Sequence, residues 1–245
     1  MLRAVIFDLW GTLIEEDAAS NAARRLERVA MASAALRQRG HAYDDAHIEH
    51  AFDAAGGALS RVHADGLDLS TEGRTVLYIR HIDEALPDRL DDDGWRAMHE
   101  AILTSARRHP PKVMPGARDA LDAVRDLGLP CGLISNAGIT PGFVLREVLD
   151  RFGLLDALDH PIFSDEVELS KPSAAIFEQA LERFGIEPHE AAFVGDQPVL
   201  DVLGPMNAGL WSVQVGDIAQ DGIEPHARVP SVADVVPALR SLGLV

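Results

Sequence analysis

The chain has only one cysteine, Cys131, in 245 residues, and it has no apolar run as long as a membrane span. A single cysteine excludes an internal disulfide framework. Because Cys131 lies within the apolar run 129–134, we expect a buried thiol that takes no part in chemistry. A bilayer span needs roughly 20 consecutive apolar residues, and no cleavable signal precedes the first apolar segment. We therefore expect a cytoplasmic protein that does not bind membranes.

Positive charge is also scarce, since 22 Lys and Arg stand against 39 Asp and Glu, for a formal net charge of −17. Such a charge repels phosphate backbones and anionic lipid. The arginines between residues 24 and 39 alternate with Ala, Leu and Glu at helical spacing, and Arg107-Arg108 is an isolated pair. Both groups are typical of solvated helix faces. We expect no nucleic-acid partner and a small-molecule anionic substrate, bound by a monomer or a homodimer.

The composition is that of a folded protein, with 47% hydrophobic and 25% charged residues. Residues 17–107 show helical periodicity. One apolar stripe before Gly40 consists of Ala22, Leu26, Val29, Ser33 and Leu36. Further helices are predicted at 46–55, around 76–86 and at 95–106. Along the helix around 76–86 the chain has Arg74, Tyr78, Arg80 and His81, polar side chains of a kind that usually faces water.

After Pro110-Pro111 the pattern changes to alternating helices and strands. Helices are predicted at 116–127, 143–152, 174–184, 199–208 and 232–242, and strands at 130–134, 160–163, 191–194 and 211–215. The run 2–7 predicts a further strand that is buried on both faces. This alternation indicates an α/β fold with a doubly wound parallel sheet. We expect a core formed by residues 1–16 and 108–245, interrupted by an all-helical cap at 17–107.

Polar residues follow four of the predicted strands. Asp8 ends the first strand in FDLWGTL, Ser135 and Asn136 follow the strand at 130–134, Lys171 lies in LSKPS, and Asp196 lies in VGDQPVLD. Ligands of parallel sheets bind beyond the carboxyl ends of the strands, where these residues should meet. The insert that begins after Asp8 would overhang the same edge and exclude water.

With these four motifs in order, the chain resembles the haloacid dehalogenase-like (HAD) hydrolases, which combine a Rossmann-like core with a cap. The motifs are FDLWGTL, LISNAG, LSKPS and VGDQPVLD. Asp8 is then the expected nucleophile, which forms a covalent aspartyl intermediate that water hydrolyses. Lys171 would neutralise charge, and the hydroxyls of Thr12 and Ser135 would hold anionic oxygens. The substrate-binding residues would be Trp10, Gly11, Ser135 and Asn136.

Two carboxylates, Asp8 and Asp196, would form an oxygen-rich site suited to Mg²⁺. The resemblance implies two further contributions to this site. The backbone carbonyl of Trp10 would be a ligand, and Asp201 would support the metal directly or through another ligand. These residues and Mg²⁺ favour a phosphohydrolase that acts on a small phosphorylated metabolite.

Trp10 departs from the family pattern. Most phosphatases that the chain resembles have an aspartate at this position, which protonates the leaving group. An indole cannot do so, and loss of general acid-base catalysis lowers rates roughly 10²- to 10⁴-fold. Glu15, Glu16 and Asp17 follow in the loop, but acids at such a position are more typical of a solvated hinge.

Two alternatives remain open. The 2-haloacid dehalogenases use the same kind of aspartate to attack carbon without a metal, and they usually have an aromatic residue, Tyr, where Trp10 stands. Their fourth motif, however, lacks the Gly-Asp pair that is present here as Gly195-Asp196. The other alternative is a binding or regulatory protein that has lost efficient catalysis. We favour the phosphohydrolase.

Overall fold

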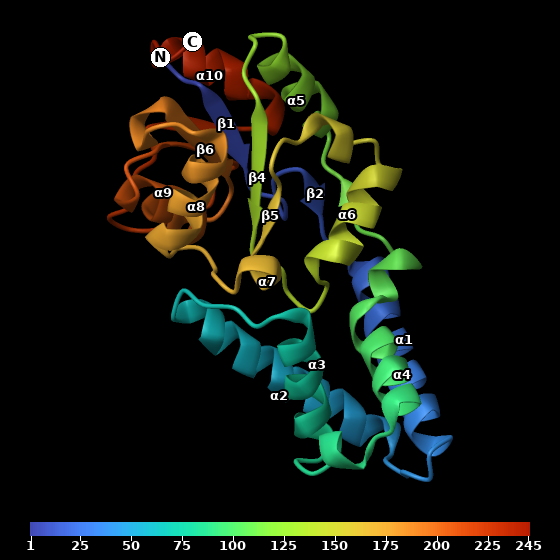
Figure 1. The fold of residues 1–245 in the computed structure, drawn as a ribbon. Coiled ribbons are helices and arrows are strands. Elements are labelled where there is room, and N and C mark those ends of the chain that lie inside the picture. The colour runs from blue at the N-terminus through green and yellow to red at the C-terminus, as the bar shows by residue number, and fades with distance from the viewer.

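A six-stranded sheet forms the centre of the molecule, in which every pair of neighbouring strands is parallel (Figure 1). The computed structural model describes residues 1–245. The strand order is β5-β4-β1-β6-β7-β8. The strands are β1 Ala4–Phe7, β4 Cys131–Ser135, β5 Ile162–Phe163, β6 Ala191–Gly195, β7 Trp211–Val215 and β8 Ala227–Val229. The predicted parallel sheet is confirmed, although β8 was not expected.

Helices cover both faces of the sheet, because side chains alternate between the faces along each strand. On one face Val5 and Phe7 pack against three helices, which are α5 Ala117–Arg125, α6 Gly142–Arg151 and α10 Val235–Ser241. On the other face Ile6 packs against α8 Ala174–Phe184. The fold is therefore doubly wound. Short helical segments complete it: α7 Ser164–Val167, α9 Gly204–Asn207, the π-helical turn η5 Pro198–Leu203, and the 3₁₀ turns η1 Pro87–Arg89, η2 Ser105–Arg107, η3 Leu155–Ala157, η4 Pro188–Glu190 and η6 Val232–Asp234.

Four helices between β1 and β4 form a bundle beyond the carboxyl ends of the strands (Figure 1). They are α1 Ala18–Arg37, α2 Asp45–Ala64, α3 Thr71–Ile82 and α4 Asp92–Leu103. Each begins at a side chain that accepts a backbone N–H, and these N-caps are Asp17, Asp44, Ser70 and Asp91. The bundle has its own apolar core. The exact division of the chain at residues 16 and 107 stays a prediction.

A short antiparallel pair of strands joins the bundle to the sheet. Its strands are β2 Ile14–Glu15 and β3 Lys112–Val113. Lys112 Nζ also donates to Asp17 Oδ1 at 2.9 Å, next to the start of α1. Neither strand was predicted, because two residues are too few for a periodic pattern. The acidic run 15–17 thus belongs to a paired connection, in which Asp17 has a structural role.

Several expectations about side chains in the bundle were wrong. Leu26 was expected in an apolar stripe, yet it is 70% exposed, while Arg24 and Arg28 on the same helix are buried. Arg74 and Tyr78 are buried as well, whereas Arg80 is exposed as expected. A helical period marks one face of a helix, but it does not reveal an arginine that finds a partner or a cavity inside.

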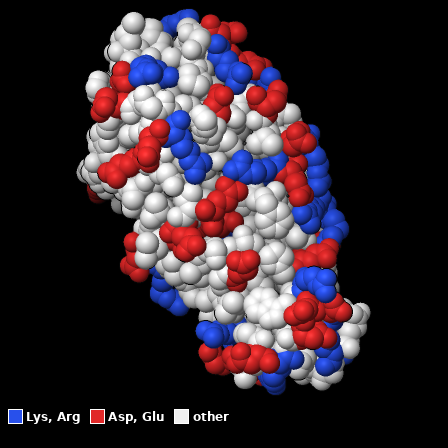
Figure 2. Space-filling view, in the orientation of Figure 1, with Lys and Arg blue, Asp and Glu red and all other residues white.

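The two termini lie together at the end of the sheet away from the bundle (Figure 1), where Leu2 N donates to Leu244 O at 3.1 Å. Acidic and basic side chains are interspersed over the face drawn in Figure 2. No helix combines the length and apolar character that a bilayer span requires. Cys131 is buried in the core, as expected.

Candidate active site

Asp8 lies where the topology of the sheet reverses direction. From β1 the chain passes through the bundle to β4 and β5 on one side, and it then crosses back to β6 on the other. Such a switch point leaves a crevice at the carboxyl ends of the strands. Phe7 is in register with Val194, and Asp8 N donates to Val194 O at 2.8 Å. The pairing of β1 with β6 therefore places Asp8 beside Asp196.

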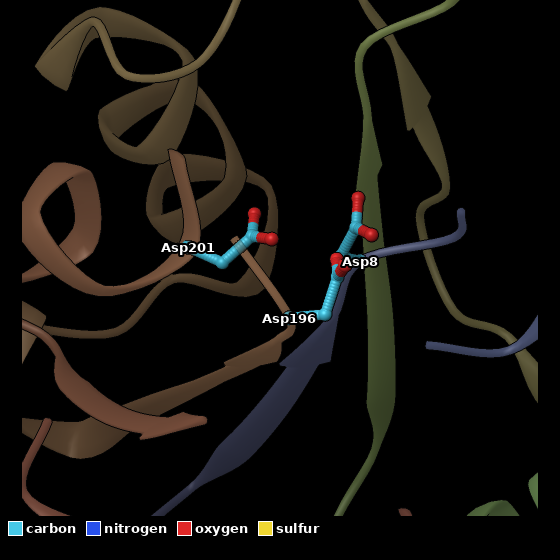
Figure 3. A group of neighbouring side chains, drawn as sticks. All are labelled: Asp8, Asp196 and Asp201. Atoms are coloured by element: carbon cyan, nitrogen blue, oxygen red, sulfur yellow. The ribbon is translucent and has the colours of Figure 1, made fainter. Parts of the chain in front are cut away.

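Three carboxylates meet at this crevice (Figure 3). Asp8 follows β1, Asp196 follows β6, and Asp201 lies in η5, and each offers an oxygen within 4.8 Å of the others. Asp8 is 6% exposed and Asp201 is 1% exposed. The sequence had predicted all three acids for one site, and the structure brings them together.

The predicted lysine joins the same cluster. Lys171 Nζ lies 2.5 Å from Asp8 Oδ1 and 2.7 Å from Asp201 Oδ1, and its side chain is 1% exposed. Burial alone would lower the pKa of Lys171, but Asp201 and Asp8 together outweigh it and raise that pKa. Lys171 is therefore a buried cation held between two carboxylates.

Asn136 fixes the backbone of this lysine. Its side-chain amide donates to Lys171 O at 2.9 Å and accepts from Lys171 N at 2.8 Å. The side chain was predicted to bind substrate, and that role stays a prediction. Its two hydrogen bonds show that Asn136 also holds the backbone of Lys171 in position.

Two glycines let the backbone come close to the acids. Gly11 has φ +81°, and a Cβ at this position would lie 2.6 Å from Asp196 Oδ2. A Cβ at Gly195 would likewise collide with Asp201. Because nearly every other residue is strained at such a φ, Gly11 is required by both the turn and the carboxylate behind it.

Several polar groups in the crevice have no partner within the chain. The buried atoms Thr12 Oγ1, Ser135 Oγ and Asp196 Oδ1 form no hydrogen bond. The backbone N–H groups of Leu9 and Trp10 also donate to no acceptor. Unpaired buried polar groups are unfavourable, and native proteins rarely keep them without a ligand or water. A bound polar ligand would satisfy these donors and this carboxylate oxygen.

The charges of the site fit a divalent cation. Loss of hydration, the largest influence, raises the pKa of Asp8, and Asp201 and Asp196 add to the rise, although Lys171 opposes it. Burial likewise raises the pKa of Asp196. One ammonium among three carboxylates leaves negative charge uncompensated. A hard cation that prefers oxygen ligands, such as Mg²⁺, matches these residues and the unpaired Asp196 Oδ1.

Asp201 is already engaged on both oxygens. Oδ1 accepts from Lys171, and Oδ2 accepts from Gln197 N at 2.9 Å. Gln197 also donates through Nε2 to Asp196 Oδ2 at 2.5 Å. These bonds favour a supporting role for Asp201. Gln197 had no predicted role, and its position directly after Asp196 was the only signal that would have found it.

A cavity of about 310 Å³ lies between the sheet edge and α1, and residues next to the cluster line it. Trp10 and Asn136 line it on the side of the sheet, and Glu16, Arg24 and Arg28 line it on the side of the bundle. Glu16 is ion-paired with Arg24. Trp10, which stands where the family usually has an acid, is thus part of the wall of a cavity that arginines also line.

The class of protein follows from a family comparison. The model of haloacid dehalogenase-like hydrolases matches residues 2–209, which include the helical bundle and all four strand-end motifs. The protein is therefore a hydrolase, and the chain belongs to the haloacid dehalogenase-like hydrolase family.

Individual relatives include a phosphatase and a nucleotidase. The chain is 33% identical over 132 residues to glyceraldehyde 3-phosphate phosphatase of Methanothermobacter thermautotrophicus, and this match covers 52% of the chain and 57% of that protein. The match therefore spans little more than half of the relative. Pyrimidine 5′-nucleotidase of Escherichia coli is 40% identical over 176 residues, with 69% of this chain and 75% of that protein covered.

A solved structure shows the same fold. The 2-haloacid dehalogenase from Pseudomonas syringae pv. tomato has a TM-score of 0.73 and 20% identity, and the match covers 99% of this chain and 100% of that one. At such a low identity the match shows that the two folds are alike. It does not distinguish phosphate ester hydrolysis from dehalogenation.

Proposed function

We propose that the protein is a Mg²⁺-dependent phosphohydrolase that acts on a small phosphorylated metabolite through an aspartyl-phosphate on Asp8. The observation that carries the proposal is the set of carboxylates in Figure 3, in which the buried Asp196 Oδ1 has no partner. Carbon-halogen hydrolysis by a carboxylate needs no cation, and it gives no reason for a second acid in this position. The phosphatase and nucleotidase relatives support the same choice.

Asp8 is the nucleophile of the proposed reaction. One of its oxygens attacks phosphorus, and the Asp8–phosphorus bond forms as the bond from phosphorus to the leaving oxygen breaks. Water then attacks phosphorus, and the bond between Asp8 and phosphorus breaks. Inorganic phosphate leaves with the oxygen and a proton of the water, and the Asp8 carboxylate is restored. Both steps fit a side chain that is rigidly held, because Lys171 fixes Asp8 from one side.

The remaining polar groups hold the transferring phosphoryl group. The unpaired hydroxyls of Thr12 and Ser135 donate to its oxygens, as do the free turn amides of Leu9 and Trp10. Lys171 offsets part of the negative charge. Asp8, Asp196 and the carbonyl of Trp10 would hold Mg²⁺, which would supply a Lewis acid for the phosphoryl oxygens.

The experiment that tests this function follows two products in parallel. The purified protein is given an aryl phosphate, an acyl phosphate and a 2-haloacid, each with Mg²⁺ and after chelation, and phosphate and halide release are measured. We expect phosphate release that depends on Mg²⁺. Metal-independent halide release would identify a dehalogenase. A folded protein that releases neither product would favour the binding or regulatory alternative.

The dehalogenase remains the second candidate because of Trp10. Halide departs without a proton, so that reaction has no use for an acid at this position. Trp10 also packs against the apolar core and lines the cavity beside the site, as an apolar wall for a carbon substrate would. The parallel assay separates the two chemistries directly.

Asp196→Asn is expected to weaken Mg²⁺ binding and phosphate release together. The amide keeps the shape of the side chain but removes one of the two charges that would hold the cation, and we expect kcat/KM to fall on the order of 10²-fold or more. Binding is measured separately, as the rise in melting temperature that Mg²⁺ produces. The exposed Asp221→Asn is the matched control, with both properties at wild-type level. Unaltered Mg²⁺ dependence in Asp196→Asn would remove this residue from the metal site.

Trp10→Asp is expected to raise turnover of alkyl phosphates, since it restores a proton donor where the family usually has one. We expect a gain of roughly 10²-fold, the lower end of what general acid catalysis contributes. Trp10→Asn is the matched control, because it opens the same space without a transferable proton. Equal rates in the two variants would show that space, and not the proton, limits alkyl phosphates.

A further inference from the structure

Arg28 lies on the wall between two cavities. The first is the cavity of about 310 Å³ that adjoins the catalytic cluster through Trp10 and Asn136. The second, of about 210 Å³, lies among the bundle helices and is lined by Phe52 and Tyr78. Arg28 and Ile139 line both. Arg28 is therefore within reach of a ligand in either cavity.

The charge of Arg28 is buried and has no partner. The residue is 8% exposed, its Nε is buried without a hydrogen-bond partner, and none of its guanidinium nitrogens forms an ion pair. Five donors in a rigid planar group make arginine a strong receptor for carboxylate and phosphate. Here all of them are free, and the residue faces two cavities.

The neighbouring arginines show that this state is particular to Arg28. Arg24 donates to His109 O at 2.7 Å and pairs with Glu16. Arg25 binds both acids that line the second cavity, with Nε 2.9 Å from Glu49 Oε1 and Nη2 2.5 Å from Asp53 Oδ2. Glu16, Glu49 and Asp53 are thus paired with other arginines, and no acid forms an ion pair with Arg28.

The environment of Arg28 is unfavourable without a ligand. Burial, and then the adjacent charge of Arg24, lower the pKa of Arg28 to about 10. A buried ion that lacks a counter-ion destabilises the folded protein. An anion in either cavity removes this penalty, because it supplies both the opposite charge and hydrogen-bond acceptors.

We propose that Arg28 binds a second anionic group of the substrate, a carboxylate or a further phosphate, at the end away from the phosphoryl group that Asp8 attacks. This orientation rests on the proposed phosphohydrolase function. The substrate is then a phosphomonoester with two anionic ends, and Trp10 lies along its path between them. Tyr78, whose hydroxyl forms no hydrogen bond within the chain, lines the inner cavity that the second group would enter.

Binding of unreactive phosphonates tests the proposal without any need for turnover. Calorimetric titration compares a short alkylphosphonate with two analogues of equal chain length that end in a carboxylate or in a second phosphonate. We expect the charged end to raise affinity by about 10- to 100-fold in the wild type, as a charge-assisted contact does. Arg28→Gln should abolish this gain, and Arg28→Lys should keep part of it. The analogue with the larger gain identifies the class of the second anion.

The control is Arg37→Gln on the same helix, where an exposed arginine lies 3.7 Å from Asp45. It removes the same charge far from both cavities and should preserve the full gain. Arg28→Gln should also raise the melting temperature of the free protein by a few degrees, because a buried unpaired charge is lost. If the two analogues with a second anionic end bind the wild type no better than the simple alkylphosphonate does, the proposal is wrong. Absence of phosphate release in the product assay would instead overturn the phosphohydrolase function.

Discussion

Asp8→Asn is expected to abolish turnover while the protein remains folded. An amide oxygen is a very poor nucleophile toward phosphorus, and loss of a nucleophile typically lowers kcat by on the order of 10⁴-fold or more. The fold should persist because Asn has the same shape, and its oxygen can still accept from Lys171 Nζ, which lies 2.5 Å from Asp8 Oδ1. Initial rates and thermal melts of the two proteins check both parts of the prediction.

The intermediate on Asp8 can be identified directly. Acid quenching of the wild type during turnover should give a peptide that contains Asp8 and carries one phosphoryl group, and this peptide should be absent from Asp8→Asn. Turnover in water labelled with heavy oxygen adds a second criterion. Attack of water on phosphorus places the label in the released phosphate, whereas hydrolysis of a carbon ester at its carbonyl places it in Asp8. Near-normal turnover by Asp8→Asn would remove this residue from the nucleophile role.

The sequence allowed the arrangement of the candidate site to be predicted because several of its residues lie at the ends of strands. Asp8, Ser135 and Asp196 are each next to a short apolar run, and parallel strands bring their carboxyl ends to one edge. Local pattern and sheet topology are then sufficient to place these side chains together. The same reasoning identified the helical insert, because its period differs from that of the flanking segments.

Other features depend on contacts between residues distant in the sequence. Arg74 is buried because Asp68, Leu69 O and Gly138 O surround its guanidinium, and no helical period reveals such partners. Arg28 is buried beside two cavities, although its sequence pattern matched a solvated helix face. The strand β8 consists of only Ala227–Val229, and it is defined by its pairing with β7. Short strands and buried charges are therefore where prediction from one sequence failed.

The two unusual residues of the site face the same space. Trp10 departs from the family pattern, Arg28 lacks a partner, and both line the cavity beside the carboxylates. In this arrangement Trp10, at the position that usually transfers a proton, forms an apolar wall of the cavity. The guanidinium of Arg28 is available to orient a ligand. Trp10, in place of the usual acid, and the proposed anion site at Arg28 would thus contact the same ligand. Binding data on Arg28→Gln therefore also help to interpret the variants of Trp10.

Lys171→Met is expected to lower both stability and turnover strongly. Lys171 is the only cation bonded to Asp8 and Asp201, so its removal leaves buried carboxylates without an internal counter-ion. Loss of one partner from a buried ion pair destabilises a protein by about 3–5 kcal/mol. For a chain of this size that corresponds to a fall in melting temperature of roughly 6–20 °C. We expect kcat to fall on the order of 10²- to 10³-fold, as for loss of a transition-state donor.

A double-mutant cycle separates the structural from the catalytic role of this lysine. Asp201→Asn removes one of the two carboxylates that Lys171 neutralises, so combined with Lys171→Met it should restore part of the melting temperature. It should not restore turnover, because the charge beside Asp8 is still missing. Lys112→Met, at an exposed lysine paired with Asp17, is the matched control and should have little effect on either property. If the double variant recovers stability and turnover together, Lys171 contributes to folding alone; if it recovers neither, the carboxylate pair is not the source of the instability.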